Sequence, residues 1–139
     1  MMTRVLLLTL GLLLTTGCAT GRLIGTLPIV PDATQVATVV VARPYTFIGS
    51  ARAPMILIDG QATYDIGPGE HVMIPVAPGE RLVSMYIWDL LNSVRASVKI
   101  QAVAGKAYYF VMAPGSNLVE VTEADGREHV ANTTAVATP

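Results

Sequence analysis

Residues 94–102 read Val-Arg-Ala-Ser-Val-Lys-Ile-Gln-Ala, an unbroken alternation of apolar and polar side chains. Successive side chains of a β-strand point to opposite faces, so this stretch predicts a strand with one buried and one solvated face. Comparable strand signals occur at short spacing on both sides, at 36–43, 55–58, 61–66, 72–76, 82–88, 108–112 and 118–121. Turns rich in Gly and Pro separate them, and we expect no amphipathic helix after residue 17.

Three local features fix how these strands are arranged. Val36 to Arg43 is apolar on both faces, which indicates a central strand. Asp59-Gly60 lies between two strand signals and predicts a tight hairpin, because a type I′ turn needs positive φ at both central residues. Pro75 has no N–H to donate, so its strand should lie at an edge or contain a bulge.

These patterns predict an all-β fold. We expect a small antiparallel β-sandwich, immunoglobulin-like or carboxypeptidase-regulatory-like, of about seven to eight strands.

The N-terminus has the layout of an export signal. Arg4 precedes an apolar run from Val5 to Leu14, and small residues lead to Cys18. This run is too short to cross a bilayer, which needs roughly 20 apolar residues, and it predicts a helical signal peptide over residues 1–17.

Cys18 is the single cysteine, so it cannot form an internal disulfide. The run Leu14-Thr-Thr-Gly-Cys18 resembles a bacterial lipoprotein signal, in which the cysteine thiol is lipidated and becomes the first mature residue. A signal cleaved elsewhere, which would leave an incidental cysteine, is the alternative. By resemblance to enterobacterial sorting rules, Ala19 favours the outer membrane.

The rest of the chain divides into three parts. Residues 18–35 contain Gly and Pro without sustained periodicity and are expected to form a tether. Residues 36–129 should form the sandwich, and residues 130–139 a flexible tail.

Composition excludes two classes of protein. The chain has 139 residues, 52% hydrophobic and 14% charged, which is too apolar for a disordered protein. Nine Lys and Arg against ten Asp and Glu give a net charge of −1, so no nucleic-acid partner is expected. The low charge content is typical of a largely buried domain or of one covered by a partner.

The sequence contains no recognisable catalytic, cofactor or metal site. Its two histidines, His71 and His129, are too few for a zinc site, and His71 is expected at the surface. No Gly-x-Ser-x-Gly elbow and no phosphate-binding glycine loop occurs. We therefore expect no enzymatic activity.

A possible binding surface comes from Arg43 and the aromatic residues. Its candidates are Arg43, Tyr45, Phe47, Tyr86, Trp88 and Tyr109. Core packing is the alternative for the rings. Adjacent Tyr108 and Tyr109 must point to opposite faces of one strand. Arg43 either anchors a carboxylate across the sheet or is a solvated charge at a strand end.

Several landmarks resemble a bacterial lipoprotein family catalogued as domain of unknown function 2846. They are Arg43-Pro-Tyr-Thr-Phe-Ile-Gly-Ser-Ala51, Ile58-Asp-Gly60, Pro78-Gly-Glu80 and Ala104-Gly-Lys-Ala-Tyr-Tyr109. The resemblance covers about residues 36–125 and implies an exported β-rich lipoprotein. It brings no catalytic residues.

The leading hypothesis is a non-enzymatic, lipid-anchored protein on the periplasmic face of the outer membrane, with a structural or protein-interaction role. A glycan- or peptidoglycan-binding module that uses exposed aromatic rings is the alternative. An accessory lipoprotein of an envelope or secretion complex is a third hypothesis. The expected partners are the membrane, through the lipid, and envelope proteins or peptidoglycan. The sequence leaves the oligomeric state open.

Overall fold

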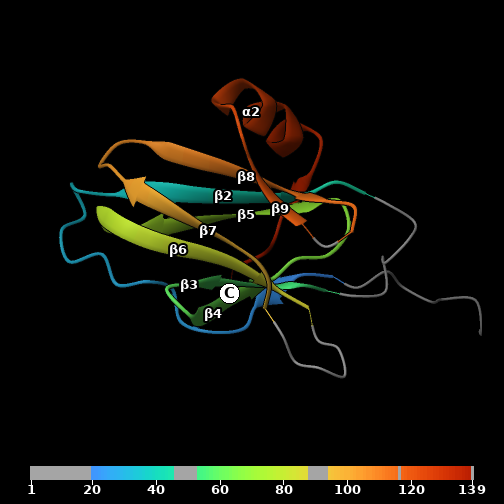
Figure 1. Cartoon of the computed structure of the whole chain (residues 1–139), viewed down its shortest axis with the longest axis horizontal. Coiled ribbons are helices and arrows are strands. Elements are labelled where there is room, and N and C mark those ends of the chain that lie inside the picture. Colours follow the sequence, from blue (N-terminus) through green and yellow to red (C-terminus); the bar gives the residue numbers. More distant parts are fainter. Residues whose placement is uncertain (1–19, 46–52, 88–93, 116, 139) are drawn as a thin grey trace, which may run out of the picture.

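The computed structural model describes residues 20–45, 53–87, 94–115 and 117–138. The expected signal peptide, Cys18, Phe47 and Trp88 lie outside these residues. Two five-stranded sheets pack face to face (Figure 1). The first sheet has the order β1 (Arg22–Leu23), β4 (Gln61–Asp65), β3 (Met55–Ile58), β6 (Gly79–Tyr86), β7 (Val94–Ala102). The second has the order β10 (Thr134–Ala135), β5 (Glu70–Val76), β2 (Ala37–Arg43), β8 (Ala107–Ala113), β9 (Asn117–Val121).

The predicted β-sandwich is confirmed, and each predicted strand corresponds to one of β2 to β9. The first sheet is antiparallel throughout. The second sheet is mixed, because β2 pairs with β8 in parallel and β10 pairs with β5 in parallel. The expectation of a fully antiparallel sandwich is therefore wrong for the second sheet. A strand such as β8, separated from β2 along the chain by β3 to β7, is free to return in either direction.

The alternation in β7 and the Asp59-Gly60 hairpin are confirmed, whereas the strand with Pro75, β5, lies between β10 and β2 and pairs with β2 without a bulge. In β7, Ile100 and Ala102 are buried while Lys99 and Gln101 are exposed. At the β3–β4 hairpin, Asp59 and Gly60 have φ of 51° and 82°. These are the positive angles that a type I′ turn requires.

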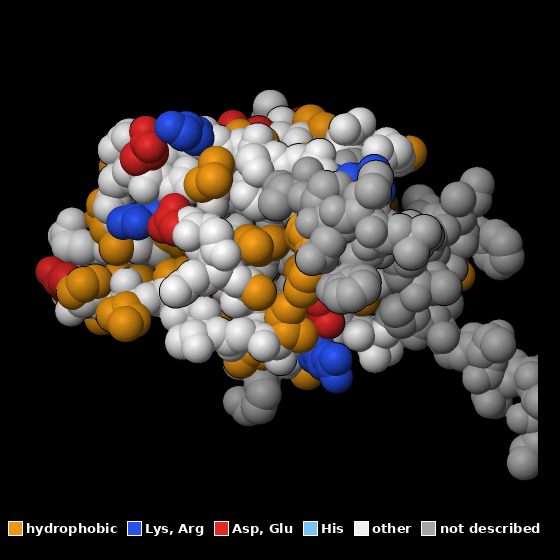
Figure 2. Space-filling view, turned by 60° about the horizontal axis from the view of Figure 1, so that its bottom comes forward, with side chains coloured by type: hydrophobic (Ala, Val, Ile, Leu, Met, Phe, Trp, Pro, Cys, Tyr) orange, Lys and Arg blue, Asp and Glu red, His pale blue; other side chains and the backbone are white. Residues whose placement is uncertain are grey.

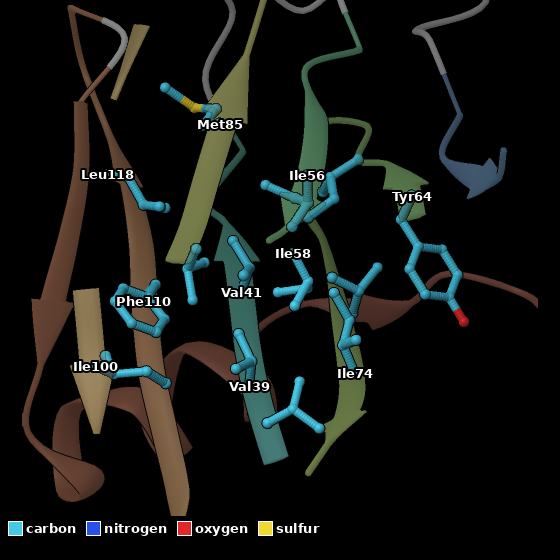
Figure 3. Packing of buried hydrophobic residues seen from close by; sticks show 14 of the residues in the cluster. Val39, Val41, Ile56, Ile58, Tyr64, Ile74, Met85, Ile100, Phe110 and Leu118 are labelled. Carbon is cyan, nitrogen blue, oxygen red and sulfur yellow. The ribbon is translucent and has the colours of Figure 1, made fainter. Parts of the chain in front are cut away.

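The strand β2 is central and buried on both faces, as its sequence predicts. Its inward residues Val39 and Val41 belong to the core between the sheets (Figure 3). Its outward residues Val40 and Ala42 are also buried, because a helix covers this face of the second sheet. Figure 3 shows the core residues contributed by the two sheets, among them Ile56, Ile58, Ile74, Met85 and Phe110.

The covering helix, α2 (Glu123–Ala131), is a departure from the sequence analysis, which expected none. It begins at the N-cap Thr122, whose hydroxyl accepts a hydrogen bond from the Asp125 N–H at 3.2 Å. Gly126 is its only buried residue. The helix therefore docks through its backbone and not through an apolar stripe, which is why the sequence shows no helical periodicity.

Residues 18–35 are not simply the tether that the sequence predicts. Arg22 and Leu23 pair with Asp65 and Tyr64 as strand β1. The N–H groups of the next two residues then donate to the Thr63 carbonyl, at 2.9 and 3.2 Å. Leu23 also packs against the core, so residues 22–25 are fixed to the first sheet.

The predicted flexible tail is also wrong for its described part. The N–H of Thr134 donates to the Gly69 carbonyl, and the N–H of Val136 donates to the His71 carbonyl, both at 2.9 Å. Val136 is 8% exposed and belongs to the core. These contacts place the C-terminal segment along β5. Further on, Thr138 Oγ1 lies 3.2 Å from the hydroxyl of Tyr64 in β4.

Candidate functional site

A cluster of polar groups lies where the turn between β4 and β5 meets the start of the described chain. Glu70, the first residue of β5, is its centre. Glu70 Oε2 accepts hydrogen bonds from the Gly67 N–H and from the Gly21 N–H, both at 2.7 Å. Hydrogen bonds to a charged acceptor are among the stronger ones in proteins. Glu70 therefore ties the N-terminal segment of the first sheet to the second sheet.

Arg43 faces the same cluster from the end of β2, directly opposite Glu70 in the β2–β5 ladder. It shares the inward face of β2 with Val41, is only 8% exposed, and donates from Nη1 to the Ile66 carbonyl at 2.8 Å. Burial lowers the pKa of Arg43, and the charge of Glu70 opposes this shift. Of the two interpretations drawn from the sequence, the cross-sheet carboxylate partner fits the structure, and a solvated strand-end charge does not.

Tyr45 lies two residues beyond Arg43 and is 65% exposed. It packs over the turn at Gly69, where an added Cβ would lie 3.6 Å from the Tyr45 Cβ. Gly69 has φ of 72°, a conformation that favours glycine. Tyr45 therefore lies close to this turn while most of its side chain is exposed.

The other predicted binding residues do not join Tyr45. Tyr86 is half-buried at the end of β6. Tyr108 and Tyr109 lie on opposite faces of β8, as predicted. Tyr108 packs against the core, and its hydroxyl donates to the Gln101 carbonyl at 2.7 Å. Tyr109 lies beneath α2, so close to Gly126 that an added Cβ there would overlap the ring.

His71 is buried, 7% exposed, and the expected surface position is wrong. Its strand face points outward as predicted, but the chain that follows α2 covers it. His71 Nδ1 lies 2.9 Å from Thr133 Oγ1, which itself donates to the His129 carbonyl at 2.7 Å. The Thr133 hydroxyl proton is thereby used, so His71 Nδ1 carries the proton and donates.

This burial makes stability depend on pH. Burial lowers the pKa of His71 below its usual 6.5, while a hydrogen bond with the Thr133 backbone opposes the shift. The unfolded chain therefore takes up this proton more readily than the folded one. We expect the melting temperature to fall as the pH is lowered from about 7.5 to about 5.5, because the stability is lost below the unfolded pKa.

His71→Gln should flatten this pH dependence, since glutamine does not titrate. The measurement is the melting temperature of both chains across the pH range. His129→Gln is the matched control for the loss of a histidine as such. Equal slopes for wild type and His71→Gln would contradict the prediction.

The surface charges lie in small local groups. Salt bridges join Arg81 to Asp59 at 2.9 Å and Lys99 to Glu80 at 3.3 Å. Figure 2 shows one face, on which charged side chains lie in such small groups among hydrophobic and uncharged ones. On that face the charge is dispersed.

Neither a metal-binding group nor a membrane-spanning helix occurs among the described residues. No three or more His, Cys, Asp or Glu side chains among them are grouped so as to hold a metal ion. No helix in this part of the chain is long and apolar enough to cross a membrane.

Neither the hydrogen bonds of Glu70 nor the close packing at Gly126 was predicted from the sequence. A Pro-Gly-Glu run gives no information about register, so the sequence alone does not place Glu70 opposite Arg43. For α2, one signal was present: Thr122 followed three residues later by Asp125 resembles a capping box.

No protein-family model, curated protein or solved structure matches this chain. The resemblance to the family of domain of unknown function 2846 therefore stays a prediction.

Proposed function

We propose that this chain is a lipid-anchored envelope protein with a structural or protein-interaction role and no catalytic activity of its own. The observation that carries the proposal is the sequence layout before Cys18: Arg4, the apolar run from Val5 to Leu14, and small residues leading to the cysteine. Gly21, three residues after the cysteine, already donates its N–H to Glu70 of the sandwich, so an anchor at Cys18 would lie close to the described fold.

The chemistry of the anchor supports this arrangement. A lipoprotein cysteine carries two or three acyl chains, and each buried methylene contributes about 0.8 kcal/mol. Such an anchor holds the chain at a membrane without a membrane-spanning segment. The leader layout ahead of Cys18, and Ala19 after it, favour the periplasmic face of the outer membrane.

Three described polar side chains of the kinds that catalysis uses have structural partners. Asp59 accepts hydrogen bonds from the Leu82 N–H and from Arg81 Nη1, both at 2.9 Å. His71 pairs with Thr133, and Glu70 holds two backbone N–H groups. Their positions are explained by the fold, which favours a structural or interaction role over hydrolysis.

Glycan binding has less support from the described residues. Stacking on sugars would need two or three coplanar exposed rings. Of the described aromatic residues, only Tyr45 is exposed. We therefore do not extend the proposal to a glycan ligand.

The anchor is tested by metabolic labelling with palmitate in a Gram-negative host. We expect label in the wild-type chain and its complete loss in Cys18→Ala, because no other cysteine can accept the diacylglyceryl group. The wild-type chain should sediment with membranes, and Cys18→Ala should be released with the periplasmic contents. Equal labelling of both chains, or none in either, would contradict the proposal.

The interaction role is tested by a pull-down from solubilised membranes. Wild type and Cys18→Ala are used as the paired baits. A partner recovered with the wild-type chain alone would need membrane placement, whereas recovery with both would place its contact on the sandwich itself.

A further inference from the structure

The short distance between Cys18 and the fixed part of the chain determines which end of the sandwich meets the membrane. Gly21 is held by Glu70, and Arg22 is already paired with Asp65 in the first sheet. Three residues span at most about 11 Å. With an acyl anchor on Cys18, the backbone at Gly21 must lie within that distance of the acylated residue.

The residues around Gly21 form one end of the sandwich, which we call the anchor end: Gly21, Arg22, Arg43, Tyr45 and residues 65–70. In the first sheet, Arg22, Asp65, Met55 and Tyr86 are successive partners across the strands. In the second sheet, Arg43, Glu70 and Thr134 are successive partners. In Figure 1 the start of the described chain and the end of β2 lie at the same right-hand end.

Two side chains at the anchor end suit a lipid surface. Tyr45 is 65% exposed and packs on Gly69, the neighbour of the glutamate that holds Gly21. Tyrosine is enriched at membrane–water interfaces because its ring is apolar and its hydroxyl polar. The Arg22 side chain is 78% exposed and 3.6 Å from Asp65, so its guanidinium is accessible to headgroup phosphates.

We propose that the anchor end rests on the phospholipid headgroups, with the ring of Tyr45 in the membrane interface. This inference rests on the proposed lipid anchor at Cys18. The headgroup layer of one leaflet is about 5–8 Å thick, comparable with the reach of the three-residue link. The domain is therefore held against the surface in one orientation, in contrast to a domain on a long tether.

The same geometry places the opposite end of the sandwich away from the membrane. The Asp59-Gly60 hairpin and the turn after Ala102 lie at that end, since Ala102 pairs with Gly79 while Val94 pairs with Tyr86. From Val94 to Ala102 the strand β7 extends roughly 27 Å. Val103, 45% exposed, is the matched exposed apolar residue at this far end.

The test measures the depth of a fluorescent label on the full chain in phospholipid vesicles. Tyr45→Cys and Val103→Cys are labelled separately with an environment-sensitive maleimide dye. An acylated Cys18 is blocked as a thioether, so each chain carries one dye. The same two variants with Cys18→Ala added, mixed with the same vesicles, are the references.

We expect iodide quenching at position 45 to fall several-fold relative to its reference, with a blue-shifted emission. Quenching at position 103 should equal that of its reference. Equal quenching at 45 with and without the anchor, or protection at 103 instead, would overturn the inference. Protection at 45 in cell envelopes but not in purified vesicles would also overturn it and indicate a protein partner.

A parallel assay separates this inference from the proposed function. Wild-type chain that floats with the vesicles and does not react with maleimide establishes the anchor, whatever the labels report. Wild-type chain that reacts with maleimide and does not float refutes the anchor, and with it the orientation.

Discussion

Gly126→Ala is expected to lower the free energy of unfolding by about 2 kcal/mol, which corresponds to about 8 °C in melting temperature. A Cβ at this position would overlap Cβ, Cγ and Cδ1 of Tyr109, the part of the side chain that moves least. The helix α2 must then shift away from β8. This exposes apolar surface of the second sheet, including Val40 and Ala42.

The expected destabilisation is opposite in sign to the effect of Gly→Ala in a solvated helix. In a solvated helix, Gly→Ala stabilises by about 1 kcal/mol, because alanine loses less backbone entropy. A stabilised Gly126→Ala would contradict the close docking of α2. The control is the double-mutant cycle with Tyr109→Ala, in which removal of the ring should make Gly126→Ala neutral or stabilising. Thermal unfolding followed by circular dichroism measures all four chains.

The strands could be predicted from the sequence, whereas the helix that contains Gly126 could not. The strands β2 to β9 have alternating patterns or continuous apolar runs, because each buries one or both faces. The helix α2 buries only Gly126, so its sequence lacks an apolar stripe. Its position depends on a close backbone approach to Tyr109, and single-sequence periodicity contains no information about such an approach.

The chain ends were mispredicted for a related reason. Residues around Leu23 and Val136 lack sustained periodicity, yet each forms a short strand or a backbone contact along an edge. Two-residue strands are held mainly by backbone hydrogen bonds to neighbouring segments. Every residue except proline offers the same backbone N–H and C=O, so composition does not predict which residues form these hydrogen bonds.

Two identical short sequences in this chain have different structural roles. The sequence contains Pro68-Gly-Glu70 and Pro78-Gly-Glu80, two identical runs. Glu80 is exposed and pairs with Lys99 at the surface, whereas Glu70 holds two backbone N–H groups and lies opposite Arg43. The difference comes from strand pairing: β5 pairs with β2 so that Glu70 lies opposite Arg43, whereas Glu80 lies opposite Gln101 of β7. A role for Arg43 across the sheet was considered from the sequence, but its partner was not identified.

Glu70→Ala is therefore expected to destabilise the chain by about 3 kcal/mol, since hydrogen bonds to charged groups contribute roughly 1.5–3 kcal/mol each. The change leaves the N–H groups of Gly21 and Gly67 without their acceptor, and it removes the carboxylate opposite buried Arg43. The N-terminal segment should also detach from the sandwich. Limited proteolysis should then cleave between residues 21 and 35 faster than in the wild-type chain, in addition to the lower melting temperature.

Glu80→Ala is the matched control, because it removes the same side chain from the same local sequence. Its carboxylate is 67% exposed and 3.3 Å from an equally exposed lysine, so its loss should cost less than about 1 kcal/mol. Glu70→Gln should fall between the two, because the amide oxygen still accepts hydrogen bonds but carries no charge. Equal destabilisation by Glu70→Ala and Glu80→Ala would show that Glu70 does not hold the N-terminal segment. The short link from Cys18 would then behave as a tether, and the lipid anchor alone would not orient the sandwich.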